Sequence, residues 1–222
     1  HLVRGLTSKP WWDQDTQHWP VVQLLVKHAS QIRTEVMQAF AATDGFRARA
    51  ELSEDSQALV AEGRWNEVNL IKHGFPQLTN NALLPLTSRL VLSLPEAATM
   101  VRGGSKISIM APGTLVSSHS GLSNSRLRVH LGISVPENCG IVVDQSAPRT
   151  WPEGQCIIFD DSFVHSVWQN GTTPRVVLIV DIWHPELDDE DAREATLTGP
   201  GDEHLLNKYR EIRHRAIVGT PS

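Results

Sequence analysis

The sequence predicts a mainly β protein whose core is a double-stranded β-helix, or jelly roll, packed against N-terminal α-helices. Two observations lead to this prediction. In the first third of the chain, apolar residues recur at three- and four-residue steps, which is typical of amphipathic helices. From residue 105 the chain changes to short segments of period two, bounded by Gly, Pro, Asn and Asp, as in an antiparallel sandwich or barrel.

The composition indicates one folded domain. The 222 residues include 40% hydrophobic and 20% charged side chains, with a net charge of −5, which is ordinary for a globular chain. A chain of this length buries roughly 70% of the surface that its unfolded form exposes, so it needs no disulfide framework. We expect a single domain over residues 1–222, with a helical part at 1–104, the jelly-roll core at 105–187 and a helical extension at 188–222.

The helices are expected in three stretches before the core and in two after it. Residues 74–84 are expected to form a loop, and the acidic run 188–191 is typical of a helix start. The terminal helix, residues 205–217, is polar. The expected helices before the core are residues 20–40, 53–63 and 95–101.

The strands of the core are expected at residues 107–110, 126–135, 141–144, 156–159, 164–169 and 175–183. On the second of these, alternation places Leu127 and Val129 on one face and Arg126, Arg128 and His130 on the other. A solvated outer face explains such a pattern more often than a binding site does. The segments that follow favour a site.

Several classes of function are excluded by charge and hydropathy. The chain is acidic and has no Lys- and Arg-rich run, so nucleic acid is not an expected partner. No apolar stretch approaches the roughly 20 residues that span a bilayer, and no signal-peptide pattern is present. Because the chain begins at His1, we expect a soluble domain that is either excised from a longer or membrane-anchored protein or cytoplasmic. Cys139 and Cys156 lack zinc-clip or thioredoxin spacing, and one disulfide between them stays an option.

Two histidines occupy positions that suit metal ligands. His165 shares a strand face with Phe163 and Val167, where a histidine is either a satisfied core residue or a ligand. His119 is expected in a polar loop, residues 117–124, where packing gives no reason for it. Loops beside rigid strands commonly carry metal ligands.

An arginine completes the pattern. Arg175 heads a very apolar strand, where a charge is costly unless it lies at the strand end in water or pairs with a buried anion. A jelly roll with a histidine after an early strand, a second on a late strand and an arginine on the next has the layout of iron(II)- and 2-oxoglutarate-dependent oxygenases. Most such sites add a carboxylate two residues after the first histidine. Here that position is Gly121, so a zinc cupin, an inactive enzyme and a sugar-binding sandwich stay open as alternatives.

Longer motifs point to one family. The motifs are residues 9–12 (KPWW), 108–114 (SIMAPGT), 119–132 (HSGLSNSRLRVHLG), 149–154 (RTWPEG), 159–165 (FDDSFVH) and 180–187 (VDIWHPEL). With these motifs the chain resembles the catalytic domain of the aspartyl/asparaginyl β-hydroxylases. That family lacks the usual acidic ligand, which agrees with Gly121.

The resemblance implies roles for the metal and cosubstrate residues. His119 and His165 would bind Fe(II), with water in place of the missing carboxylate. Arg175 and Ser108 would hold the distal carboxylate of 2-oxoglutarate. A guanidinium fork assisted by a hydroxyl suits a buried carboxylate, and neutral imidazoles suit iron(II).

The same resemblance implies roles for the neighbouring residues. Arg128 and His130 would lie by the metal-bound end of 2-oxoglutarate, and Arg126 would bind the carboxylate of the substrate. Asp160 and Asp161 would orient His165, or one of them would ligate the metal.

The implied activity is that of a single oxygenase domain that uses Fe(II), 2-oxoglutarate and O2. It would hydroxylate the β-carbon of aspartyl or asparaginyl residues in peptides or proteins. Alternatives are the same chemistry on a lipid acyl chain or another small anionic substrate, and a catalytically silent binding module. The family's lumenal members carry a cysteine-bridged loop before Ser108, whereas residues 77–90 contain no cysteine. The tail beyond Thr196 extends past the resemblance.

Overall fold

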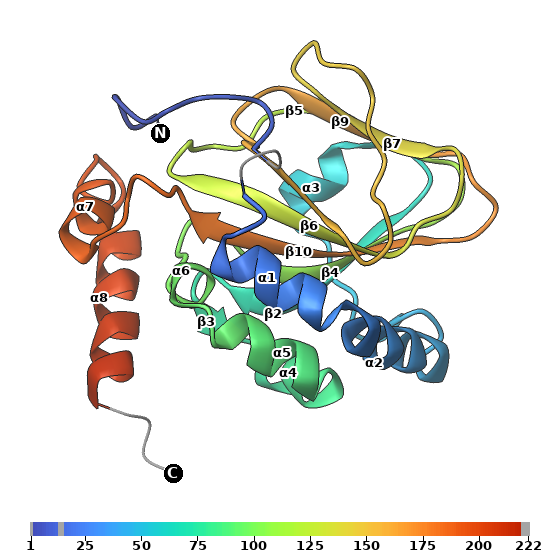
Figure 1. The fold of residues 1–222 in the computed structure, drawn as a ribbon, viewed down its shortest axis with the longest axis horizontal. Helices are drawn as coiled ribbons and strands as arrows, with labels where there is room; N and C mark the ends of the chain where they lie inside the picture. Colours follow the sequence, from blue (N-terminus) through green and yellow to red (C-terminus); the bar gives the residue numbers. More distant parts are fainter. Residues whose placement is uncertain (1, 13–15, 219–222) are drawn as a thin grey trace.

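The computed structural model describes residues 2–12 and 16–218. It contains two antiparallel sheets that face each other, which confirms the predicted jelly roll (Figure 1). The larger sheet has the order β3-β2-β4-β10-β6-β8, and the smaller has the order β1-β5-β9-β7. The strands of the larger sheet are β2 (Trp65–Lys72), β3 (Phe75–Pro76), β4 (Gly104–Met110), β6 (Arg126–Ser134), β8 (Cys156–Phe159) and β10 (Arg175–Trp183). Those of the smaller sheet are β1 (Val60–Glu62), β5 (Thr114–His119), β7 (Cys139–Val143) and β9 (His165–Gln169).

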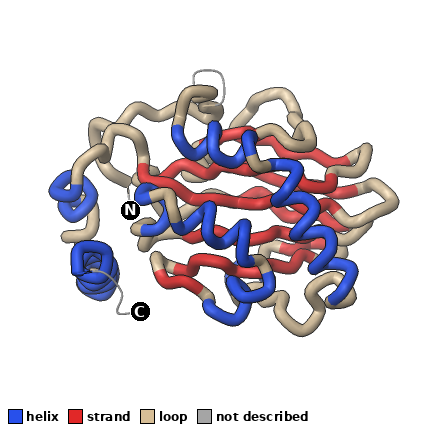
Figure 2. Tube along the Cα trace, turned by 60° about the horizontal axis from the view of Figure 1, so that its bottom comes forward, coloured by secondary structure: helices blue, strands red, loops and turns tan. Residues whose placement is uncertain are grey.

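Helices cover the outer face of the larger sheet (Figure 2). They are α1 (Pro20–Lys27), α2 (Ala29–Ala42), α4 (Leu78–Leu83), α5 (Pro85–Leu92) and α6 (Pro95–Ala98). The short α3 (Glu54–Ala58) leads into β1. The last two helices, α7 (Glu190–Ala195) and α8 (Glu203–Val218), lie together at one end of the sandwich.

The larger sheet separates two apolar cores. Leu127, Val129 and Leu131 of β6 pack with the helical layer, as the alternation on this strand predicts. On the other side, Val177 and Ile179 of β10 pack with the smaller sheet. Arg126, Arg128 and His130 therefore face the space between the sheets, where a polar group needs a partner.

Three of the expected helical or loop stretches differ in the structure. Residues 20–40 form two helices, because the backbone leaves helical angles at His28. In 53–63 only Glu54–Ala58 is helical, and β1 follows it. The expected loop at 74–84 contains β3 and α4.

The expectation that residues 1–104 are helical is wrong for β1, β2 and β3. Strand β2 was missed because its inward face is polar: Glu67 and Asn69 line a cleft, while Val68 and Leu70 pack under the helices. A register shift between Asn69 and Ile71 interrupts the period of two. The helix α5 was also missed.

The cysteines and the helices bear on two further expectations. Cys139 and Cys156 are both free thiols, so the disulfide that the sequence left open does not form. Over residues 2–12 and 16–218, no helix has the length and apolar character to cross a bilayer.

Candidate active site

The two histidines lie side by side on the smaller sheet. His119 ends β5, rather than standing in a loop as expected, and is the register partner of His165 at the start of β9. Their ring centroids are 4.2 Å apart. In each ring Nδ1 lies within hydrogen-bond distance of a carbonyl two residues earlier, Ser117 O at 2.8 Å and Phe163 O at 2.9 Å. A carbonyl only accepts, so Nδ1 carries the proton and each Nε2 keeps a lone pair for a metal.

Burial keeps both rings neutral. It lowers the pKa of His119, and it lowers the pKa of His165 to about 4, with His119 adding to the effect. A neutral imidazole is the form that binds a metal, so both rings are ready to ligate at neutral pH.

We expect the metal-free protein to lose stability as the pH falls from about 6.5 towards 4. His165 has a lower pKa when folded than its ordinary 6.5, so the unfolded chain binds more protons in this window. Its share of the free energy of unfolding falls by about 2 kcal/mol between about pH 7.5 and about pH 5. Urea unfolding at the two pH values measures this, and His165→Gln should show a correspondingly smaller pH dependence. An equal dependence in the variant contradicts the assignment.

Arg175 lies buried between the sheets with hydrogen-bonding capacity to spare. Its guanidinium lies over the Trp151 ring, 4.6 Å from the centroid, and Nη2 donates to Met110 Sδ. Nε and Nη1 have no hydrogen-bond partner among the described residues. Burial lowers the pKa of Arg175 to about 10, so it remains a cation at neutral pH. A buried cation with unused donors is costly unless an anion binds there.

Ser108 and His130 add two more donors to the same cavity. Ser108 Oγ accepts from Trp65 Nε1 at 2.9 Å, which leaves its own proton free to donate. His130 Nδ1 accepts from Trp151 Nε1 at 3.0 Å, so its proton is on Nε2, which is buried without a partner. The cavity is lined by Trp65, Ser108, Met110, Val116, His119, Arg128, His130, Ile141, Phe159, His165, Val167, Arg175 and Ile179.

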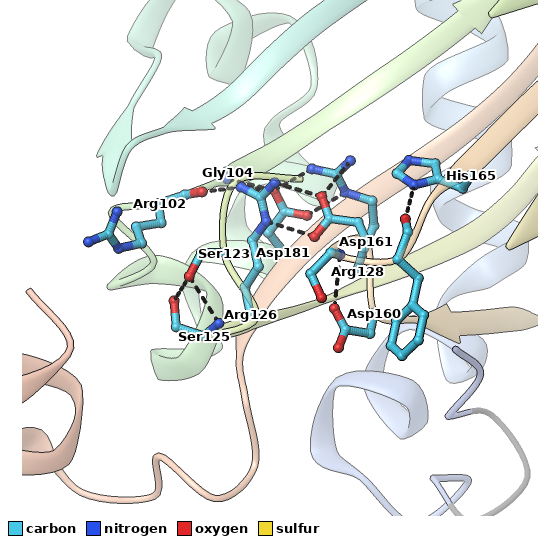
Figure 3. A network of polar contacts seen from close by, with 12 residues as sticks. Arg102, Gly104, Ser123, Ser125, Arg126, Arg128, Asp160, Asp161, His165 and Asp181 are labelled. Carbon is cyan, nitrogen blue, oxygen red and sulfur yellow. Dashed lines mark hydrogen bonds and ion pairs between the residues drawn. The ribbon is translucent and has the colours of Figure 1, made fainter. Parts of the chain in front are cut away.

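Arg126 and Arg128 form a buried network with two aspartates (Figure 3). Arg126 binds Asp161 with Nη2 at 2.6 Å and Nε at 3.1 Å. Arg128 binds Asp181 with Nε at 2.8 Å and approaches Asp161 with Nη1 at 3.2 Å. Burial alone would raise the pKa of both carboxyl groups, but the two guanidiniums outweigh it and the net pKa of each is lowered. The four charges therefore cancel, and both guanidiniums are already paired with carboxylates in this structure.

Asp161 also explains the missing acid at position 121. A Cβ on Gly121 would lie 2.5 Å from Asp161 Oδ2, and Gly121 N donates to Asp161 O at 2.6 Å. The Asp161 carboxylate thus fills the space that a side chain at 121 would need. Asp160 instead accepts from Ser162 N in its turn, at 2.9 Å. Within the described part of the chain, no group of three or more His, Cys, Asp or Glu side chains is placed to hold a metal.

Restoring the acid at position 121 should therefore harm the protein. Gly121→Asp and Gly121→Ala both place a Cβ against a carboxylate held by two guanidiniums, and overpacking of this kind costs about 1–3 kcal/mol. We expect both variants to unfold at lower urea concentration than the wild type, whereas Ser120→Ala, on the exposed neighbour, should not. Wild-type stability in Gly121→Asp would contradict the close approach.

The sequence missed three residues of the site. Asp181 could have been predicted from the sequence, because a lone acid within an apolar strand needs a buried partner. Trp65 and Trp151 gave no signal of their own, because indole donors to Ser108 and His130 depend on contacts between distant segments.

A cleft of about 640 Å³ opens beside His119 and the arginine network. Lys72, Arg102 and Lys106 stand on its walls together with Glu51 and Glu67. Lys106 pairs with Glu67 at 2.6 Å, so part of this charge is already balanced. The cleft is large enough for a side chain and the backbone next to it.

A jelly roll that holds two facing histidines and a buried arginine between its sheets has the layout of the iron(II)- and 2-oxoglutarate-dependent oxygenases. Sequence comparison gives the family. The family model described as Aspartyl/Asparaginyl beta-hydroxylase matches residues 26–185. The chain therefore belongs to the aspartyl/asparaginyl β-hydroxylase family.

Two named proteins and one solved structure are similar to this chain. The human protein named aspartyl/asparaginyl beta-hydroxylase is 37% identical over 194 residues, which cover 86% of this chain and 25% of that protein. Aspartate beta-hydroxylase domain-containing protein 2 of Xenopus tropicalis is 33% identical, covering 84% of this chain and 50% of its own length. The chain thus spans a quarter to a half of these relatives. A solved prolyl hydroxylase from Trichoplax adhaerens, in complex with a hypoxia inducible factor peptide fragment, is similar over 77% of this chain and 93% of its own, with 9% identity and a TM-score of 0.48.

Proposed function

We propose that this chain is an iron(II)- and 2-oxoglutarate-dependent dioxygenase that hydroxylates the β-carbon of aspartyl or asparaginyl residues in peptides or proteins. One observation supports it above the others: the buried, partly unpartnered guanidinium of Arg175 lies in the same cavity as two neutral histidines. An anion and a metal are the two ligands that these groups need.

The donors of the cavity fit a dicarboxylate. Arg175 and Ser108 would hold the distal carboxylate, as a bidentate fork and a single hydroxyl donor. His130 Nε2 offers a buried donor for the other end, and Arg128 lines the cavity between that end and the cleft. His119 and His165 would bind Fe(II) through Nε2. When bound, Fe(II) and 2-oxoglutarate would supply, together with O2, the oxidising power that breaks a C–H bond of the substrate.

The chain's own part is positioning and exclusion of water. Phe159, Val167 and Ile179 line the cavity with apolar surface, which strengthens the charge interactions inside it. The backbone carbonyls behind His119 and His165 fix the orientation of both rings. A fixed site of this kind holds the reacting carbon beside the oxidant and limits unproductive oxidation.

The substrate would enter from the 640 Å³ cleft. Arg126 lies on its wall, 13% exposed, and would bind the substrate carboxylate in competition with Asp161. Both an aspartyl and an asparaginyl side chain offer oxygens that a guanidinium can bind.

An anaerobic titration tests the proposal. Fe(II)-loaded protein should develop a visible absorption band when 2-oxoglutarate is added, because absorption of light transfers charge from Fe(II) to a bound 2-oxo acid. The same protein loaded with Zn(II), which has no redox chemistry, should show no band. Absence of the band in iron-loaded protein would contradict the proposed function and favour a silent binding module.

A further inference from the structure

We propose that the C-terminal extension, residues 188–218, positions Arg126 of the cleft through a two-step contact. Asp202 holds the side chain of Arg102, and the backbone of Arg102 holds Arg126. The functional meaning of this contact rests on the proposed role of Arg126 towards the substrate. Residues 188–218 lie outside the segment that the family model matches, so the contact is a feature of this chain beyond that match.

The extension is packed against the end of the jelly roll by a third apolar core (Figure 1). Tyr209 of α8 meets the Trp183 ring edge-on, with centroids 5.7 Å apart, and both are buried. Trp183 is the register partner of Arg126 across β10 and β6. The extension is thereby anchored one strand away from the arginine that it is proposed to position.

Arg102 lies in the turn between α6 and β4, and the extension holds its side chain. Nη2 of Arg102 bonds Asp202 Oδ2 at 2.6 Å and donates to the backbone oxygen of Thr196 at 3.3 Å. The two charged side chains are only 11% and 13% exposed. A charge pair this well shielded keeps a defined geometry, unlike an exposed surface pair.

The backbone of the same turn holds the arginine network. The carbonyl of Arg102 accepts from Arg126 Nη1, and Gly104 N donates to Asp181 Oδ2 at 3.1 Å. Figure 3 shows the side chain of Arg102 directed away from the network while its carbonyl points towards Arg126. A Cβ on Gly103 would lie 2.5 Å from Asp181 Oδ2, so the turn lies directly against the network.

Loss of the contact between Asp202 and Arg102 is expected to weaken binding of the substrate rather than binding of 2-oxoglutarate. If Arg102 loses Asp202, the turn can shift and Arg126 loses a fixed acceptor. Arg175 and Ser108 line the other cavity, whose lining does not include Arg102, Gly103 or Gly104. Weakening the Asp202–Arg102 pair should therefore raise the KM for a peptide several-fold and change kcat less than twofold.

The test uses NMR on the full chain with 15N-labelled arginine. It follows solvent exchange of the Arg126 Nη1 protons, which donate to the Arg102 carbonyl, with the signals assigned by Arg126→Lys. In Asp202→Asn this exchange should become several-fold faster. Asp202→Glu keeps the charge and should return it towards the wild-type rate. Asp191→Asn removes an exposed acid from the same extension and serves as the control without effect.

The outcomes separate this inference from the proposed function. Unchanged Arg126 exchange in folded Asp202→Asn overturns the positioning role, whatever the activity of the protein. Should Asp202→Asn not fold, Arg102→Lys weakens the same pair and must speed Arg126 exchange, or the inference fails. The kinetic arm uses the aspartyl peptide that gives the largest oxygen incorporation with wild-type protein. Failure of the iron and 2-oxoglutarate band would remove the proposed function and leave the exchange result to decide positioning.

Discussion

Replacement of Arg175 by alanine is expected to raise the KM for 2-oxoglutarate by roughly 30-fold or more. Removing one partner of a buried charge pair costs about 2–5 kcal/mol of binding, and each 1.4 kcal/mol is tenfold in affinity. Two nitrogens of Arg175, Nε and Nη1, have no hydrogen-bond partner among the described residues, so the contact with a carboxylate would be the one that uses them. Succinate formation at varied 2-oxoglutarate concentration measures the effect.

Two further substitutions separate binding from structure at this position. Arg175→Lys keeps a charge and loses the planar fork, so its KM should lie between those of wild type and Arg175→Ala. Arg175→Met keeps most of the volume and removes an uncompensated buried charge, so the ligand-free protein should unfold at no lower urea concentration than wild type. A large loss of stability in Arg175→Met would mean that the guanidinium is structural and that no anion is needed there.

Replacement of His165 by alanine is expected to abolish succinate formation, a loss of roughly a thousandfold or more, comparable to removing a key catalytic group. One imidazole of two is removed, and no third His, Cys, Asp or Glu is grouped with them in the described part of the chain. The variant should also fail to retain Fe(II) in an anaerobic titration. His28→Ala, in the helical layer between α1 and α2, is the matched histidine control and should keep both properties. Iron retention and turnover in His165→Ala would remove His165 from the metal site.

Sequence reasoning found the face of β6 because alternation is a local property of a strand. Leu127 and Val129 lie on the helical side and Arg128 on the cleft side, as period two requires. The charge state of that face could not be predicted. It depends on the register that sets Asp181 opposite Arg128, and on a turn that brings Asp161 to both arginines. These pairings join residues 35 and 53 positions apart, which no local pattern reports.

Other features of the molecule could not be predicted for the same reason, since they depend on contacts between segments far apart in the sequence. Strand β2 has polar residues where it faces the cleft. The sequence alone does not show the cleft, so it could not show that these polar residues belong to a strand. The vacancy at Gly121 could be noticed in the sequence, but its steric reason is the Asp161 carboxylate beside it. The contact between Asp202 and Arg102 joins the extension to the cleft and has no counterpart in any motif.

We propose that this site oxidises an aspartyl or asparaginyl residue at the expense of 2-oxoglutarate. Mass spectrometry of a library of Asp- and Asn-containing peptides, incubated with Fe(II), 2-oxoglutarate and labelled O2, tests it most directly. We expect one added oxygen atom, carrying the label, on an Asp or Asn residue, only when 2-oxoglutarate is present and not with His165→Ala. Turnover of 2-oxoglutarate that a fatty acid or a small acid stimulates, with no peptide oxidised, would contradict the assigned substrate class.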